Sequence, residues 1–300
     1  MRTALQYFAL ALASAALAAE GLSNPCMAAA PAEEDAVGVV ADYRPTDAQF
    51  TFVRPPRDET VPVQIGTIVV AGDRVNLKRG FSITVQLADG EVSRFEGPGN
   101  FVVPAGSSLG KLAAIFRSLP RLFDDTAALS GTAASRDMQT CVVAGHAPNP
   151  IDAPIVRSGA RIVAGTRDLS LAWRGGCPPF TVRVSSGATR VAQVNSIDDW
   201  QVRIENLELG AGLHTLLITD ATGKRWQEVI EAVTEGPVVP AHLAADMSGL
   251  GLTAQAIWIA QLDGGRWRLE SIERLRQQVR ENDPLATYIS ESLLWGAPVR

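Results

Sequence analysis

The sequence predicts a mainly β protein with a helical tail, in which two small all-β modules precede a C-terminal helical segment. Short runs such as Phe81–Leu87 alternate apolar and polar residues, which is the pattern of strands with one buried face. Pairs such as Asp89-Gly90 follow these runs and are typical of tight turns. After Pro240 the apolar residues are instead spaced by three and four, which indicates helices.

Residues 1–19 are predicted to be a secretory signal peptide, because one arginine precedes an apolar run that ends in an A-x-A cleavage site at Ala18. The alternative is an uncleaved anchor, but the run is shorter than the roughly 20 residues that span a bilayer. A second candidate cut follows Ala28 or Ala30. We therefore expect a protein that is periplasmic or secreted.

The composition is that of an acidic globular protein, with a formal net charge of −5 and 20% charged residues. Lysine and arginine are not clustered as phosphate backbones require, so we expect no nucleic-acid partner. A hydrophobic content of 46% is enough to build cores, and the length allows about two domains. No phosphate-binding, dinucleotide or calcium-binding motif is found, so no cofactor is predicted.

The first β module is predicted over residues 37–104, after a flexible leader at residues 20–36 that is rich in alanine, proline and acidic residues. Residues 54–57 are predicted to form an exposed loop. Gly90 provides the positive φ that a hairpin turn needs. The expected core of the module comprises Val39, Phe52, Ile65, Ile83, Val85, Leu87 and Phe95.

The stretch Ile65–Pro104 resembles the FecR-type periplasmic domain, in which a Gly-Asp pair, here Gly72-Asp73, precedes a strand, a turn, an alternating strand and an Asp-Gly turn. The resemblance implies periplasmic signalling, in which the domain senses another envelope protein. Regulators of that family carry a cytoplasmic sigma-factor-binding region and a transmembrane helix, and we identify neither here. The resemblance therefore implies an accessory that signals through a membrane partner.

A helix is predicted within residues 105–123, followed by a connector at residues 124–153. Ser107 or Ser108 is expected to cap the helix, and Pro120 to kink or end it. Its apolar stripe comprises Leu109, Leu112, Ile115, Phe116 and Leu119.

The second β module is predicted over residues 154–236 as an immunoglobulin-like or fibronectin-like sandwich, because about seven short strands are separated by turn signals. Leu169, Leu171 and Trp173 alternate with polar or small residues in one of these strands. The Cys…Trp…Cys pattern of antibody domains is absent, because Trp173 precedes Cys177 by only four residues. The resemblance is therefore one of architecture.

Cys141 and Cys177 are candidates for a disulfide bond, because an exported chain with three cysteines favours pairing. Such a bond would stabilise the fold by roughly 4 kcal/mol in the loop-entropy model. The alternative is two separate buried thiols.

The tail, residues 237–300, is predicted to contain three helices over Thr253–Leu262, Trp267–Glu281 and Pro284–Trp295. Asp283 is expected to cap the last helix, with proline in its first turn, and Gly296 to end it. We expect the tail to pack on the second sandwich or on a partner. Trp267 and Trp295 are candidates for a surface that contacts another protein.

Gly106–Gly110 matches the G-x-S-x-G pattern of hydrolases, which would make Ser108 a nucleophile. Such a site needs a histidine base and an acid, for which the candidates are His146, His214, His242, Asp124 and Asp125. An α/β-hydrolase also needs a parallel sheet, whereas the strands upstream of Ser108 have the hairpin pattern. The pattern is better explained as a helix start.

No metal site is predicted either, because Cys141 and His146 are two candidate ligands without the spacing of a tetrahedral site. The sequence therefore favours an exported, non-enzymatic envelope protein that acts by recognition or signalling through protein contacts. Its partner would be an envelope or membrane protein. The alternatives are a protein that binds peptidoglycan or another wall polysaccharide and, more remotely, a serine hydrolase that uses Ser108.

Overall fold

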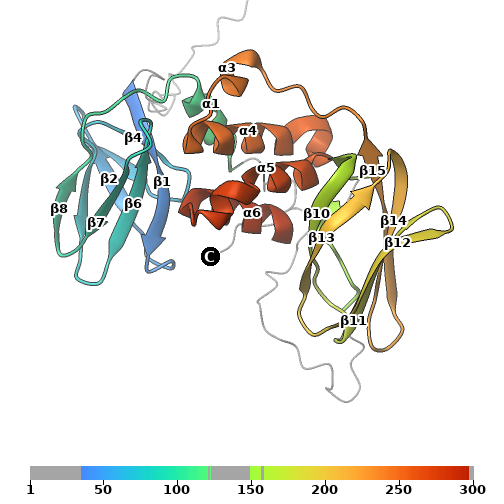
Figure 1. Cartoon of the computed structure of the whole chain (residues 1–300). Coiled ribbons are helices and arrows are strands. Elements are labelled where there is room, and N and C mark those ends of the chain that lie inside the picture. Colours follow the sequence, from blue (N-terminus) through green and yellow to red (C-terminus); the bar gives the residue numbers. More distant parts are fainter. Residues whose placement is uncertain (1–34, 121, 123–148, 157–158, 297–300) are drawn as a thin grey trace, which may run out of the picture. The chain divides into compact units, whose positions relative to one another are not determined.

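The computed structural model describes residues 35–120, 122, 149–156 and 159–296, which belong to one compact unit spanning residues 31–300. The predicted signal peptide, most of the leader and most of the connector lie outside these residues. The predicted fold class is confirmed: the described chain is mainly β with a C-terminal helical segment (Figure 1). No helix in this part of the chain is both long and apolar enough to cross a membrane.

Eight strands form the N-terminal sandwich, which consists of two four-stranded antiparallel sheets with the orders β4-β1-β6-β7 and β3-β2-β5-β8 (Figure 1). The predicted hairpin joins β6 to β7, with Gly90 at φ 90°. The strands are β1 (Ala36–Arg44), β2 (Thr51–Arg54), β3 (Glu59–Pro62), β4 (Ile68–Val70), β5 (Arg74–Leu77), β6 (Ser82–Leu87), β7 (Val92–Glu96) and β8 (Gly99–Val102).

The core of the N-terminal sandwich lies between its sheets and includes Phe52, Ile83, Val85 and Leu87, as predicted. The expectation that β6 buries only one face is wrong. Gln86, on the opposite face, is 5% exposed and its Nε2 donates to Asp283 at the start of the last helix, at 3.0 Å. Both faces of β6 are therefore covered at Gln86. For the same reason Val39 belongs to the core shared with the helices, and not to the core between the sheets.

Helix α1 (Leu112–Ser118) follows the N-terminal sandwich and buries Leu112 and Phe116. The predicted serine cap is wrong, because the helix begins after Lys111 without a side-chain cap. Ser108 Oγ instead accepts the Gly110 N–H at 3.1 Å, within the preceding turn. A serine hydroxyl makes this local bond readily, and it competes with capping.

Seven strands form the second sandwich, with a five-stranded sheet in the order β12-β11-β14-β15-β9 and a two-stranded sheet, β10-β13 (Figure 1). Strand β9 pairs with β15 in parallel, and the other pairs are antiparallel. The strands are β9 (Arg161–Val163), β10 (Gly165–Ala172), β11 (Phe180–Ser186), β12 (Thr189–Ile197), β13 (Gln201–Leu209), β14 (Gly212–Thr219) and β15 (Arg225–Val233); the short 3-10 helix η2 (Pro154–Val156) precedes them.

The C-terminal segment contains α3 (Ala241–Ala244), α4 (Gly249–Gln261), the 3-10 turn η3 (Leu262–Gly265), α5 (Arg268–Arg280) and α6 (Pro284–Trp295). The predicted cap of α6 is confirmed, since Asp283 Oδ1 accepts the Ala286 N–H at 2.9 Å and Gly296 ends the helix in the left-handed conformation. Helix α4 begins earlier than predicted because Ser248 caps it by accepting the Gly251 N–H. Helix α3 was not predicted.

The helices share one apolar core with the second sandwich, which includes Leu171, Trp173, Ile257 and Ile289. Polar groups add to this contact. Glu270 of α5 is 5% exposed and accepts the N–H of Val163 on the edge strand β9 at 3.0 Å. The expectation that the helical tail packs on the second sandwich is therefore confirmed.

Candidate functional site

Cys177, one of the two predicted disulfide partners, is disulfide-bonded and 3% exposed. Its backbone N–H donates to Asp220 Oδ2 at 3.1 Å. Cys141 lies outside the described residues, so the pairing of these two cysteines stays a prediction.

The two predicted contact tryptophans are placed differently. Trp267 is 7% exposed; its Nε1 donates to Asp263 at 2.9 Å, and Arg161 lies 5.8 Å from the ring centroid. This burial leaves little of Trp267 for a partner. Trp295 is half-buried and its backbone oxygen accepts a hydrogen bond from Arg174 at 2.7 Å. The contact-surface hypothesis therefore stays open only for Trp295.

Ser108, the candidate nucleophile, is exposed and lies in the loop after β8. That strand belongs to an antiparallel sheet, so Ser108 lacks the parallel sheet that the hydrolase motif requires. Of its candidate partners, His146, Asp124 and Asp125 lie outside the described residues. His214 is buried on β14, where its Nε2 is 2.7 Å from the Gly210 oxygen, and His242 is exposed on α3.

The described residues contain no group of three or more histidine, cysteine or acidic side chains that could hold a metal ion. The charged groups gather instead in ion pairs. One pair, Arg54–Asp73, lies inside the N-terminal sandwich: Arg54 donates to both Asp73 carboxylate oxygens, at 2.9 and 2.8 Å, and to the Ile68 oxygen at 3.0 Å. Arg54 is the last residue of β2 and is 9% exposed, so the prediction that it lies in an exposed loop is wrong.

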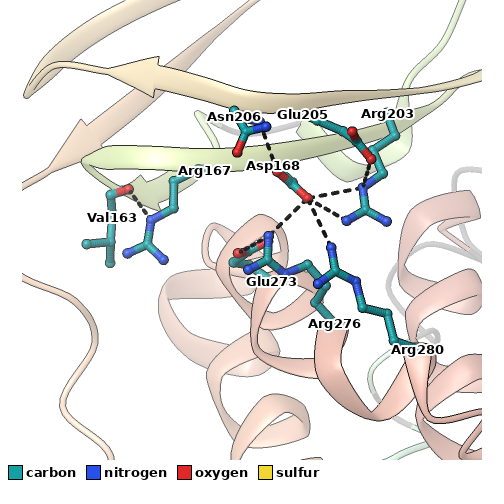
Figure 2. A network of polar contacts seen from close by, with 9 residues as sticks. All are labelled: Val163, Arg167, Asp168, Arg203, Glu205, Asn206, Glu273, Arg276 and Arg280. Carbon is teal, nitrogen blue, oxygen red and sulfur yellow. Dashed lines mark hydrogen bonds and ion pairs between the residues drawn. The ribbon is translucent and has the colours of Figure 1, made fainter.

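A second cluster centres on Asp168 of β10, where the second sandwich meets α5 (Figure 2). Three arginines surround this carboxylate, which is 8% exposed. Arg203 of β13 donates to Oδ2 from its Nε at 3.2 Å, and Arg276 of α5 lies 2.9 Å from the same oxygen. Arg280, one turn later in α5, lies at 3.9 Å. The Asn206 N–H donates to Oδ1 at 3.0 Å.

These contacts set the charge of the cluster. The Arg203 guanidinium, together with the Asn206 N–H and Arg276, lowers the pKa of Asp168 to about 2, because each stabilises the charged carboxylate. Burial raises the pKa of the neighbouring Glu273, although Arg276 lies 3.2 Å away. Asp168 lies on β10 and its partners come from β13 and α5, so the cluster joins the helical segment to the second sandwich. This is a structural role.

The surface best suited to recognition is the outward face of the sheet β12-β11-β14-β15, here called the outer sheet face. Because side chains alternate along a strand, the inward residues, such as Val182 and Leu216, enter the core. Register places Arg183 between Gln193 and Leu217. The residues that form the outer sheet face are Thr181, Arg183, Ser185, Arg190, Gln193, Leu213, Thr215, Leu217, Thr219, Arg225, Gln227, Val229 and, at its margin, Glu231.

A shallow cavity of about 130 Å³ opens on the outer sheet face. Its lining carries two guanidinium groups, two hydroxyls, an amide and one apolar side chain, and no carboxylate; the residues are Thr181, Arg183, Gln193, Leu217, Thr219 and Arg225. Beside it, Leu213 and Val229 are 65% and 37% exposed. Exposed apolar and arginine side chains on one face are typical of protein contacts.

A larger and mainly apolar groove of about 540 Å³ lies on the sheet β3-β2-β5-β8 of the N-terminal sandwich. Val53, Phe101 and Val102 line it. The exposed pair Arg74–Asp58 borders it. Each sandwich therefore has one sheet with an outward face that is hollowed at the surface.

No protein-family model matches the chain, and no curated protein matches it. Among solved structures, CopC from Methylosinus trichosporium OB3b aligns with a TM-score of 0.22 and 13% identity, over 29% of this chain and 95% of that one. Fibronectin(III)-like modules of Clostridium thermocellum CbhA align with a TM-score of 0.21 and 9% identity, over 69% and 82% of the two chains. Likenesses at these scores carry no conclusion about function.

Sequence reasoning missed both the Asp168 cluster and the outer sheet face. A signal existed for each. Arg276 and Arg280 are four residues apart in a predicted helix, and therefore share one helix face. Thr181, Arg183 and Ser185 alternate with the predicted core positions of β11, which places them together on the outward side.

Proposed function

We propose that the chain is an exported, non-enzymatic protein of the bacterial envelope that acts by recognition, as an accessory to a membrane protein. The observation that carries this proposal is the outer sheet face. It gathers exposed apolar and arginine side chains on a rigid five-stranded sheet, and no described helix covers it in the way that α6 covers β6. Such a face is suited to a protein contact.

Export and signalling are supported by the sequence. The apolar N-terminal run with its A-x-A site supports a location in the periplasm or outside the cell. The resemblance of Ile65–Pro104 to FecR-type domains supports a part in envelope signalling. In the structure this stretch supplies β4 to β8 of the N-terminal sandwich.

Cross-linking in intact envelopes, followed by affinity purification of the full chain, tests this proposal. We expect a membrane protein to be recovered with the wild-type chain. Recovery should fall when Leu213→Asp and Val229→Asp are introduced together, because both charges would lie on the outer sheet face. Val92→Asp with Val102→Asp is a matched control, since these residues are 52% and 56% exposed on the other sandwich. Recovery of no membrane protein with the wild-type chain would overturn the proposal.

The second candidate is a protein that binds peptidoglycan or another wall polysaccharide. The hydroxyl, amide and guanidinium groups of the cavity on the outer sheet face favour it, because sugars are recognised by hydrogen bonds from such groups. Co-sedimentation with purified peptidoglycan separates the two candidates: the chain should pellet with the wall material only if the second one holds.

A further inference from the structure

The charge of the outer sheet face differs in sign from that of the chain. Arg183, Arg190 and Arg225 point outward there, whereas the formal net charge of the chain is −5. The carboxylate at the margin, Glu231, already meets Arg161 at 2.7 Å and Arg266 at 3.3 Å. A basic face on an acidic protein attracts partners of opposite charge.

Two of these arginines differ from the other arginines of the second sandwich in their surroundings. Arg161 and Arg203 each form ion pairs within the chain, and Arg167 and Arg174 donate to backbone oxygens. Arg183 and Arg225 are exposed and form no ion pair with any described residue. Arg190 donates only to the neutral Gln193, at 3.0 Å. The guanidinium groups of Arg183 and Arg225 can therefore each take a carboxylate from outside, without breaking an internal bond.

The sheet geometry sets the spacing of these charges. Thr181 pairs with Thr219, and Thr219 pairs with Arg225, so Arg225 lies two strands from β11 and one outward position from Arg183. Strands lie about 4.8 Å apart and outward positions about 6.8 Å apart, so the two Cα atoms are roughly 12 Å apart. An extended chain segment with several carboxylates can meet both guanidinium groups at once.

The exposed apolar residues identify the class of that segment. Leu213 pairs with Glu231 and Thr215 pairs with Val229, so Leu213 and Val229 are diagonal neighbours on the same face. Leu217 lies between them and the arginines, within the cavity. Apolar side chains beside carboxylates would bury these residues, and a protein segment supplies both.

We propose that the outer sheet face binds an acidic, extended segment of a protein partner, with carboxylates on Arg183 and Arg225 and apolar side chains on Leu213, Leu217 and Val229. This inference rests on the proposed function and adds the chemistry of the partner. The binding should weaken as salt rises, because the arginines are exposed.

A binding assay on the full chain tests the inference with a labelled synthetic peptide that alternates glutamate and valine. We expect it to bind, and the same peptide with glutamine in place of glutamate to bind about tenfold more weakly. The variant Arg183→Glu/Arg225→Glu should lose binding by at least about tenfold, and Arg183→Gln/Arg225→Gln by less. The matched control is Arg57→Glu/Arg79→Glu, which makes the same charge change at two exposed residues of the other sandwich and should leave binding within about twofold.

Circular dichroism and tryptophan fluorescence should be unchanged in each variant, because the substituted side chains are exposed. Equal binding by the wild type and Arg183→Glu/Arg225→Glu, or equal binding of both peptides, would overturn the inference. So would polygalacturonate binding as tightly as the acidic peptide. The envelope cross-linking experiment distinguishes failure of this inference from failure of the proposed function. If the wild type and Arg183→Glu/Arg225→Glu recover a membrane protein equally well, the proposed function stands and only the acidic segment is ruled out.

Discussion

In the N-terminal sandwich one buried carboxylate meets one guanidinium, whereas at the second sandwich one carboxylate is shared by three. Asp73 and Arg54 both lie within the same sandwich, and Asp73 is fully buried. Asp168 draws Arg203 from a neighbouring strand and Arg276 and Arg280 from helix α5. The first arrangement stabilises one sandwich internally. The second joins two parts of the fold at a surface that water reaches.

Removing Asp73 should have the largest effect. Asp73→Ala leaves the Arg54 guanidinium buried without its carboxylate, which costs about 3–5 kcal/mol. Urea denaturation followed by circular dichroism should show a large loss of stability. All six tryptophans lie at Trp173 or later, so their fluorescence reports on the second sandwich and the helices and should respond less at low urea. An unchanged midpoint by circular dichroism would show that the pair does not stabilise the sandwich.

Removing the charge of Asp168 should have a smaller effect. Asp168→Asn keeps the size of the side chain but leaves three guanidinium groups without a shared carboxylate, and we expect a loss of about 1–3 kcal/mol, because the arginines are partly exposed. Tryptophan fluorescence should report this loss directly. Glu205→Gln is the control, since Glu205 is 66% exposed and 3.8 Å from Arg203. If Glu205→Gln lost as much stability, the effect would come from removing any negative charge and not from the contacts of Asp168.

The stability that Asp168 contributes should depend on pH. The pKa of Asp168 falls from its ordinary value of 3.8 to about 2 in the folded chain, so its stabilising contribution is complete above pH 3.8 and is lost as the pH falls towards 2. The difference in unfolding free energy between the wild type and Asp168→Asn should therefore be constant above that range and shrink below it. A difference that persists at pH 2 would contradict this origin.

The smallest effect is expected at Asp58, which pairs with Arg74 at the surface of the N-terminal sandwich. Both side chains are more than half exposed, so Asp58→Asn should change the unfolding free energy by less than about 1 kcal/mol. Asparagine also tolerates the positive φ of this position, 52°. The same urea titration measures it. A loss of stability comparable to that of Asp73→Ala would mean that burial does not explain the difference in strength between the Arg54–Asp73 and Arg74–Asp58 pairs.

The strands could be predicted because their signal is local. Leu169 and Leu171 alternate with polar residues, and both enter the core as expected. Gln86 follows the same pattern and is buried all the same, because its partner Asp283 is 197 residues away in the sequence. The sequence predicts a loop at Arg54 for a similar reason: its proline neighbours are local in the sequence, whereas its partner Asp73 lies 19 residues away. Alternation shows which residues share a face, and only the tertiary structure shows what covers that face.

The outer sheet face could not be predicted from the sequence, because its residues come from strands that are distant in the sequence. Arg183 and Arg225 are unremarkable in the sequence, because they lie on different strands and each has ordinary polar neighbours. They belong to one surface only after β11, β14 and β15 have paired in their observed register. Trp267 shows the converse error: the sequence suggests a contact residue at the surface, whereas the side chain is buried beside Arg161.

The parallel pairing of β9 with β15 has a consequence for how the chain is made. Residues 161–163 begin the second sandwich and pair with residues 231–233 at its end. The first strand therefore has no partner in its sheet until the last one has left the ribosome. Such a distant pairing slows folding. A chain that emerges from its N-terminus would complete the N-terminal sandwich first, and would hold the second sandwich open until residue 233 had emerged, before the C-terminal helices.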